Sequence, residues 1–142
     1  MTQADFEDSS GFRMGVSKKV LIVDDEEIFA ENLQKYFQRC GWDTRLACNG
    51  KEAMIVADEF HPGLILLDYH LPDMNGLQAL DAIRAGNHCC GCVLMTGHPS
   101  ESVLAGARRR GVERVLCKPF SMAGLESHLT AAIAEFSPPP SN

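Results

Sequence analysis

The chain has 142 residues, of which 45% are hydrophobic and 23% charged, and it carries a formal net charge of −6. This length and balance are typical of one globular domain with a hydrophobic core of its own. The acidic balance argues against a surface devoted to nucleic acid, because clustered lysine and arginine hold phosphate backbones. The longest basic run is residues 108–110.

The first residues and the cysteines indicate a cytoplasmic protein with reduced thiols. Residues 1–17 are polar and acidic and lack the apolar core of a secretory signal. No stretch approaches the roughly 18 consecutive apolar residues of a membrane span. We therefore expect the six cysteines to be free thiols. Cys40, Cys48 and Cys117 lie in or beside apolar segments, where free cysteine behaves as a small hydrophobic residue.

Short apolar runs rich in valine, leucine and isoleucine predict the strands. They occupy residues 19–23, 63–67, 92–95 and 112–117, with a weaker run at residues 43–48. These runs show little alternation with polar residues, which is typical of strands buried on both faces of a parallel sheet beneath helices.

The longer segments between the runs have helical spacing, because their apolar residues recur every three or four positions. The stripes are Phe29, Leu33, Tyr36, Phe37 and Cys40; Ala53, Val56, Ala57 and Phe60; Leu77, Leu80 and Ile83; and Met122, Leu125, Leu129, Ala132, Ile133 and Phe136. Five successive strand–helix units predict a doubly wound α/β sandwich over residues 18–136. Residues 1–17 and 137–142 are expected to be flexible tails.

Polar residues collect where the predicted strands end. Asp24 and Asp25 follow the first run, Asp68 the third, Thr96 the fourth and Lys118 the fifth. The carboxyl ends of parallel strands meet at one edge of a sheet, where open α/β folds place their functional groups. Taken singly, Asp24 could cap a helix, Thr96 could be an ordinary strand-end hydroxyl and Lys118 could be solvated. Asp68 follows a fully apolar run, where a charge needs partners.

Taken together, the strand-end charges predict a metal-assisted phosphoryl site. Asp24, Asp25 and Asp68 contribute −3 and Lys118 contributes +1, which leaves −2 for one Mg²⁺ to cancel. In such a site Asp68 is the nucleophile. Thr96 can donate to one phosphoryl oxygen and Lys118 can neutralise another.

Four segments in this order resemble the CheY-like receiver domains of two-component response regulators. They are VLIVDDE at residues 20–26, LILLDYHLPDMNG at residues 64–76, VLMTGH at residues 93–98 and VLCKPF at residues 115–120. The resemblance covers about residues 18–136. It implies a three-layer (βα)5 sandwich around a five-stranded parallel sheet in the flavodoxin-like order 2-1-3-4-5.

The resemblance also implies a role for each carboxylate. Asp68 matches the phosphoacceptor, and Asp24 and Asp25 match the acidic pair that binds Mg²⁺. In the family, Asp68 and the backbone carbonyl two residues later, here that of His70, complete the protein ligands of the metal.

The remaining motif residues match positions around the phosphoryl group. Thr96 matches the hydroxyl that follows this group when the domain switches. Lys118 matches the lysine that binds it, ahead of a typically cis bond to Pro119. Pro72 and Gly76 match the loop and helix start that follow the acceptor.

Two departures from the family concern how the domain switches. Receivers usually carry Tyr or Phe two or three residues before the lysine, where this chain has Val115 and Leu116. The output surface is therefore expected to change by another route or only weakly. His70 and His98 match positions that tune dephosphorylation in the family, and the alternative is that they are two exposed loop histidines.

Two other groups each allow two interpretations. His88, Cys89, Cys90 and Cys92 suggest a metal cluster, but their spacing is too tight for the usual zinc knuckle. The favoured interpretation makes Cys92 a core residue and Cys89 and Cys90 oxidation-sensitive loop thiols. The arginines at residues 108–110 end the fourth helix, where they are either solvated or a docking site for a partner.

The resemblance implies a signalling switch rather than an enzyme. A sensor histidine kinase or phosphotransfer protein donates to Asp68, and the altered surface contacts a downstream protein or an output domain outside this chain. A homodimer through the fourth helix, fifth strand and fifth helix is a further partner that the resemblance allows. Nucleic acid and membrane are not expected partners.

The alternative function is an aspartyl-phosphate-forming small-molecule phosphatase. Such enzymes normally have a second acidic residue two positions after the nucleophile, where this chain has His70, and a cap domain for which the chain is too short. A nucleotide-binding module is disfavoured further, because no GxGxxG or P-loop motif follows the first strand.

Overall fold

A computed structural model describes residues 18–86 and 90–136 of the chain. The two predicted tails, His88 and Cys89 lie outside these residues. The elements are β1 (Lys19–Val23), α1 (Glu27–Arg39), β2 (Asp43–Ala47), α2 (Gly50–Phe60), β3 (Leu64–Asp68), α3 (Gly76–Ala85), β4 (Gly91–Thr96), α4 (Glu101–Arg109), β5 (Arg114–Cys117) and α5 (Met122–Phe136). No helix within the described ranges has the length and hydropathy needed to cross a bilayer.

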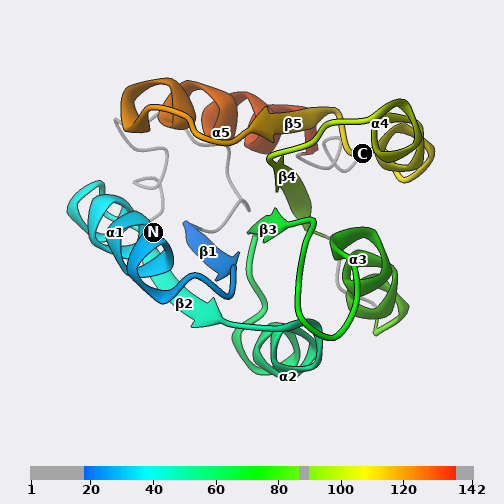
Figure 1. The fold of residues 1–142 in the computed structure, drawn as a ribbon. Helices are drawn as coiled ribbons and strands as arrows, with labels where there is room; N and C mark the ends of the chain where they lie inside the picture. The colour runs from blue at the N-terminus through cyan, green and yellow to red at the C-terminus, as the bar shows by residue number, and fades with distance from the viewer. Residues whose placement is uncertain (1–17, 87–89, 137–142) are drawn as a thin grey trace, which may run out of the picture.

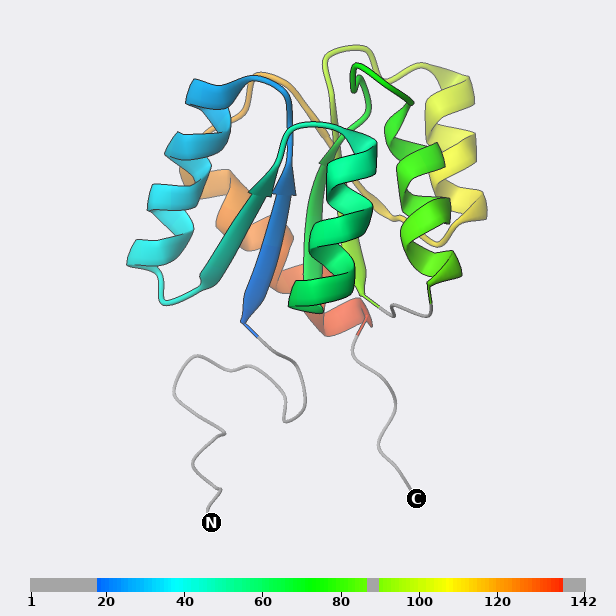
Figure 2. The same cartoon turned by 90° about the horizontal axis from the view of Figure 1, so that it is seen from below.

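The five strands form one parallel sheet in the order β2-β1-β3-β4-β5, so the predicted fold and strand order are confirmed. Helices α1 and α5 cover one face, and α2, α3 and α4 cover the other (Figure 1). The view turned by 90° shows the strands running side by side between the two helical layers (Figure 2). Because every strand points the same way, their carboxyl ends share one edge.

The core consists of two apolar clusters, one on each face of the sheet. Strands β3 and β4 are buried along their whole length, and β1 is buried from Val20 onward. The prediction from their unbroken apolar runs is therefore confirmed. The predicted helix stripes likewise supply core residues, among them Leu33, Phe37, Ala57 and Leu80.

Four of the five strands differ from the sequence expectation by one or two residues at an end. Strand β5 begins at Arg114 instead of residue 112, because the Val112 N–H donates to the carbonyl oxygen of Ala107 (2.9 Å) and so closes the end of α4. Asp68 and Thr96 are the last residues of β3 and β4, not the first residues beyond them. Both side chains are thus held by the sheet itself.

The cysteines only partly follow the prediction. All five described cysteines are free thiols, and Cys92 is a buried residue of β4 as expected. Cys90 is also buried, at 1% exposure, because it leads directly into β4; its interpretation as an accessible loop thiol is wrong. Cys48 and Cys117 are exposed, so they do not act as small core residues.

Arg110 is not a solvated arginine, contrary to one of the two interpretations. Its Nε and Nη2 atoms donate to the two carboxylate oxygens of Asp81 on α3, at 2.9 and 3.0 Å. Its Nη1 atom donates to the carbonyl oxygen of Gly106 (2.9 Å). Arg110 therefore ties the end of α4 to α3, whereas Arg108 and Arg109 are exposed.

Gly76 permits the close approach of α3 to the end of β3. Its N–H donates to the carbonyl oxygen of Tyr69 (2.7 Å), and a Cβ atom at this position would lie 2.5 Å from the carbonyl oxygen of Asp68. A side chain therefore cannot be added without moving the backbone of the acceptor strand.

We predict that Gly76→Ala lowers the free energy of unfolding by about 1–3 kcal/mol, the usual cost of overpacking. Gly97→Ala is the matched control, because a Cβ atom there meets nothing within 4 Å. Urea denaturation of both variants measures the difference. Equal stabilities would show that α3 can shift away from β3 at little cost.

Candidate functional site

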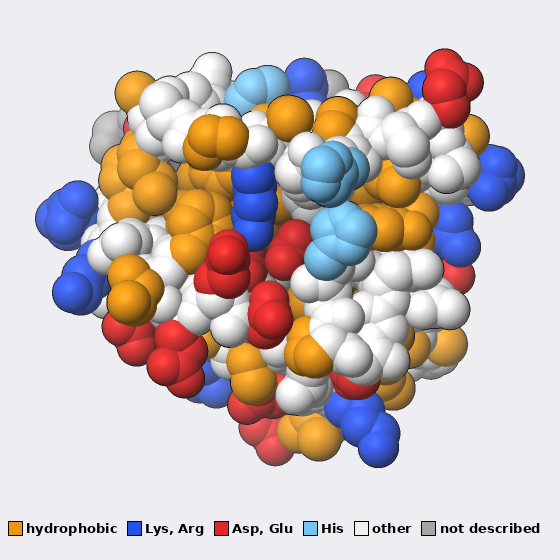
Figure 3. Space-filling view, viewed as in Figure 1, with side chains coloured by type: hydrophobic (Ala, Val, Ile, Leu, Met, Phe, Trp, Pro, Cys, Tyr) orange, Lys and Arg blue, Asp and Glu red, His pale blue; other side chains and the backbone are white. Residues whose placement is uncertain are grey.

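Three carboxylates meet at the carboxyl edge of the sheet. Side-chain oxygens of Asp24, Asp25 and Asp68 all lie within 4.8 Å of one another, as predicted. Asp24 and Asp68 are buried, at 2% and 5% exposure, whereas Asp25 is exposed. Acidic side chains gather in the same region of the space-filling view (Figure 3).

Sheet hydrogen bonds hold Asp24 in this cluster. The Asp24 N–H donates to the carbonyl oxygen of Ala47 (3.0 Å), which carries the β1–β2 pairing one residue past β1. Its Oδ1 atom accepts from the Glu26 N–H (2.9 Å). The alternative role of Asp24 as a helix N-cap is wrong, because α1 has Glu26 as its N-cap residue and no side-chain cap.

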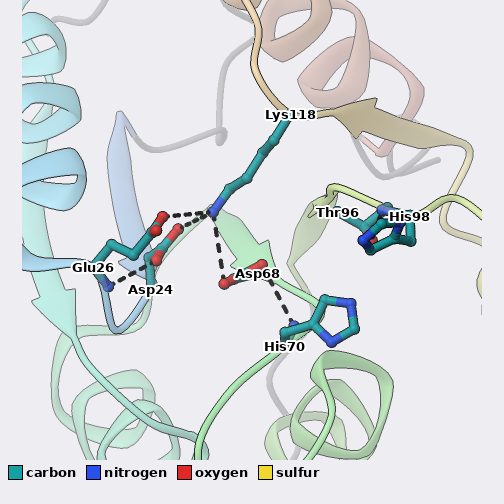
Figure 4. Close-up of polar contacts among 7 residues, drawn as sticks. All are labelled: Asp24, Glu26, Asp68, His70, Thr96, His98 and Lys118. Carbon is teal, nitrogen blue, oxygen red and sulfur yellow. Dashed lines mark hydrogen bonds and ion pairs between the residues drawn. The ribbon is translucent and has the colours of Figure 1, made fainter.

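Lys118 reaches into the carboxylate cluster from the end of β5 (Figure 4). Its Nζ atom lies 2.8 Å from Asp24 Oδ2, 3.3 Å from Glu26 Oε1 and 3.6 Å from Asp68 Oδ2. The Lys118 N–H donates to the carbonyl oxygen of Thr96 (2.9 Å), and the Lys118–Pro119 bond is cis, as the resemblance implied. The interpretation of Lys118 as a solvated lysine is therefore wrong.

The electrostatics of the cluster favour a divalent cation. Burial, and then the charge of Asp24, raise the pKa of Asp68 to about 6, although Lys118 and the His70 N–H act in the opposite direction. The four charges sum to −2, since three carboxylates face one ammonium. An all-oxygen set with this excess charge fits Mg²⁺, which prefers carboxylate and carbonyl ligands and retains waters.

Thr96 lies fully buried at the end of β4. Its Oγ1 atom accepts from the His98 N–H (3.0 Å), and a hydroxyl that accepts a hydrogen bond keeps its own proton for donation. The Thr96 side chain lies on the opposite side of Asp68 from Glu26 (Figure 4). Asp68 thus lies between two groups from the following strands. They are the Thr96 hydroxyl at the end of the neighbouring strand β4 and the Lys118 ammonium just after β5.

The loop after the acceptor is anchored to the N-terminus of α2. The carboxylate of Asp73 accepts from the N–H groups of Gly50 (2.8 Å) and Lys51 (3.0 Å), and these bonds lower its pKa. A hollow of about 430 Å³ beside the carboxylates is lined by Asp25 and by residues 69–75. Sequence reasoning missed Asp73, because an aspartate after proline is equally typical of an ordinary turn.

The structure also gives the surroundings of the residues that depart from the receiver pattern or vary within it. Val115 is half-buried in β5 beside Leu94 of β4, and Leu116 is buried in the core. His70 and His98 are exposed at the rim of the cluster, in agreement with the loop-histidine interpretation. Their role in dephosphorylation stays a prediction.

We predict that Asp68→Asn stabilises the metal-free protein at pH 7 but not at pH 4. The folded chain keeps a proton on Asp68 up to about pH 6, whereas an ordinary aspartate loses it near 3.8. The unfolded chain therefore binds fewer protons in this window, and stability falls as pH rises through it. Removing the charge of Asp68 should therefore raise the free energy of unfolding by about 1–3 kcal/mol above pH 6.

Thermal melts in a chelating buffer at pH 4 and pH 7 measure this effect. Asp43→Asn, an exposed aspartate on β2, is the control and should follow the parent at both pH values. A pH-independent difference between Asp68→Asn and the parent would mean that the carboxylates do not repel one another in the folded chain.

Comparisons with known proteins agree with this geometry. Residues 20–130 match the family model of the response regulator receiver domain. The chain is 36% identical over 104 residues to the Regulator of RpoS of Escherichia coli (strain K12), a match covering 73% of this chain and 31% of that protein. The chain thus spans about a third of the length of that relative.

Two solved structures have a similar fold. The signal receiver domain of a putative Luxo repressor protein from Vibrio parahaemolyticus superposes with a TM-score of 0.77 at 26% identity, covering 84% of this chain and 92% of that one. The CheX-CheY-BeF3-Mg²⁺ complex from Borrelia burgdorferi contains a chain with a TM-score of 0.74 at 22% identity, covering 86% and 90%.

Proposed function

This chain belongs to the response regulator receiver domain family, a signalling domain of two-component systems, and we propose that Asp68 is its phosphoacceptor. The observation that carries the proposal is the position of Asp68 at the end of β3. There its carboxylate lies in one cluster with Asp24 and Asp25 and 3.6 Å from Lys118 Nζ. The receiver domain is assigned to residues 18–136, which enclose the family match.

The phosphoryl transfer is a direct displacement at phosphorus. A carboxylate oxygen of Asp68 forms a bond to phosphorus while the bond from phosphorus to the donor breaks; the donor is a phosphohistidine nitrogen or an acyl-phosphate oxygen. The leaving group keeps the bonding electron pair and takes a proton from solvent. Lys118 neutralises one phosphoryl oxygen and the Thr96 hydroxyl donates to another. Both side chains therefore stabilise the negative charge on the phosphoryl oxygens during transfer.

Magnesium is the cofactor that this donor set fits. Asp24, Asp25, Asp68 and the backbone carbonyl of His70 would hold it, and the ion would neutralise charge on the phosphoryl oxygens. The raised pKa of Asp68 supports this assignment, because an adjacent divalent charge would restore the ionised, nucleophilic carboxylate. A similar fold from Borrelia burgdorferi was solved with BeF3 and Mg²⁺, which adds support.

The phosphoryl donor is a sensor histidine kinase or a phosphotransfer protein, in keeping with the family. The event then changes contacts with a downstream protein or with an output domain elsewhere in a longer protein. A homodimer through α4, β5 and α5 is one way in which the altered surface could be read. Val115 is too small to act as the usual aromatic relay, so the change reaches this face by other contacts. The phosphatase alternative receives no support from the signalling family.

The central prediction is that Asp68→Asn abolishes phosphoryl uptake. The protein is incubated with Mg²⁺ and a radiolabelled acyl phosphate, and the acid-stable, base-labile adduct is counted. Asp43→Asn is the control, since that exposed aspartate lies outside the carboxylate cluster and should be labelled like the parent. Equal labelling of Asp68→Asn would place the acceptor elsewhere.

We also predict that Lys118→Ala slows the labelling of Asp68 by about 10²–10³-fold, the usual cost of removing one preorganised group that stabilises transferring charge. The initial rate is measured at saturating Mg²⁺, with Lys35→Ala as the control because Lys35 is exposed on α1. An unchanged rate in Lys118→Ala would show that the ammonium serves only to balance Asp24.

A further inference from the structure

Two imidazole rings lie side by side at the rim of the acceptor pocket. His70 follows β3 and His98 follows β4, and their ring centroids are 6.4 Å apart with an interplanar angle of 83°. Both residues are exposed. The space-filling view shows histidine side chains next to the acidic group, and the close-up shows the His70 ring between Asp68 and α3 (Figures 3 and 4).

The two rings are close enough to share one metal ion after side-chain rotation. A ring nitrogen lies roughly 1.1–1.2 Å from its ring centroid, so metal–nitrogen bonds of about 2.0–2.1 Å place the two centroids about 4.5 Å apart at an angle of about 90° and about 5.2 Å apart at the tetrahedral angle. The observed separation exceeds the tetrahedral value by about 1 Å, and the rings lie edge to face. Both exposed side chains must therefore rotate about their χ torsions to turn a nitrogen toward a shared ion.

The two rings differ in chemistry from the carboxylate cluster beside them. Neutral imidazole is a ligand for Zn²⁺, Ni²⁺ and Cu²⁺, whereas carboxylate and carbonyl oxygens suit Mg²⁺. An ion chosen by the histidines is therefore of a different class from the ion chosen by Asp24, Asp25 and Asp68. The two sites are therefore distinguished by the class of ion that each takes.

Each histidine is fixed through its backbone to a residue of the acceptor pocket. The His98 N–H donates to Thr96 Oγ1 (3.0 Å), and the His70 N–H approaches Asp68 Oδ1 (3.4 Å). The ring of Tyr69 packs edge-on against the His70 ring, with centroids 4.9 Å apart. The backbone positions of the pair are thus set by the same strand ends that form the pocket.

We propose that His70 and His98 together bind a divalent transition metal of the Zn²⁺ or Ni²⁺ class at the mouth of the acceptor pocket. Water completes the coordination of the ion. A bound ion links the β3–α3 loop to the β4–α4 loop through two protein ligands. The proposal depends on the pairing of the rings and not on whether Asp68 is phosphorylated.

The test is a calorimetric titration of the full chain with NiCl2, in excess Mg²⁺ and with a phosphine reductant to keep the cysteines reduced. We expect one ion per chain. Loss of a group that merely supports a metal ligand costs about 10–100-fold in affinity, so His70→Ala and His98→Ala should each weaken binding at least about tenfold. His128→Ala, an exposed histidine on α5, is the matched control and should bind like the parent.

Two further variants make the outcome decisive. His70→Gln and His98→Gln keep a polar side chain of similar reach without the imidazole. They are used in place of any alanine variant whose melting temperature is lowered. Asp68→Asn should retain nickel binding even though it loses phosphoryl uptake, which separates this proposal from the assignment of the acceptor.

Three results would overturn the site. They are no binding by the parent, unchanged affinity in both histidine variants, and loss of nickel binding in Asp68→Asn. The second result would place the ion on other histidines, thiols or carboxylates of the chain, and the third would place it in the carboxylate cluster itself.

Discussion

Repulsion between carboxylates at one edge of the sheet is the constraint around which the pocket is built. Strands β1 and β3 are direct neighbours, with Val23 opposite Leu67, so Asp24 and Asp68 necessarily emerge side by side. Burial, and then the charge of Asp24, destabilise the ionised form of Asp68, which is why the pKa of Asp68 is raised. A cluster of this kind persists only because the sheet beneath it is apolar, buried on both faces and bonded along its length. The same repulsion makes the pocket receptive to cations.

Lys118 neutralises only part of this negative charge, and its position shows which carboxylates it neutralises most. The ammonium is closest to Asp24 and Glu26 and farthest from Asp68. Among the three carboxylates that Lys118 contacts, the acceptor carboxylate therefore lies farthest from the ammonium. Glu26 is exposed and contributes to holding the ammonium on the β1 side of the pocket. An incoming phosphoryl group, with its own negative charge, competes with Glu26 and Asp24 for the same ammonium.

Most of the architecture and the strand-end residues could be predicted from the sequence, because each follows from local pattern. Unbroken apolar runs predicted β1, β3 and β4, and a polar residue at the end of a buried run predicted Asp68. The contact of Arg110 with Asp81 could not be predicted in the same way, since it joins residues 29 apart and depends on how α3 and α4 pack. The burial of Cys90 likewise depends on β4 beginning one residue earlier than its apolar run. Side-chain partners set by helix packing leave no periodic signal.

The Arg110–Asp81 contact limits how the helices beside the pocket can move. It is bidentate, and the Arg84 guanidinium also donates to the carbonyl oxygen of Arg110 (2.5 Å), so α4 is tied to α3 through two separate arginines. A displacement of α4 alone must break these bonds, whereas a displacement that keeps them must carry α3 along as one rigid body. Helix α3 starts at Gly76, directly against the carbonyl oxygen of Asp68, and the Gly76 N–H donates to the carbonyl oxygen of Tyr69. The bonded pair α3 and α4 is therefore in direct backbone contact with the end of β3.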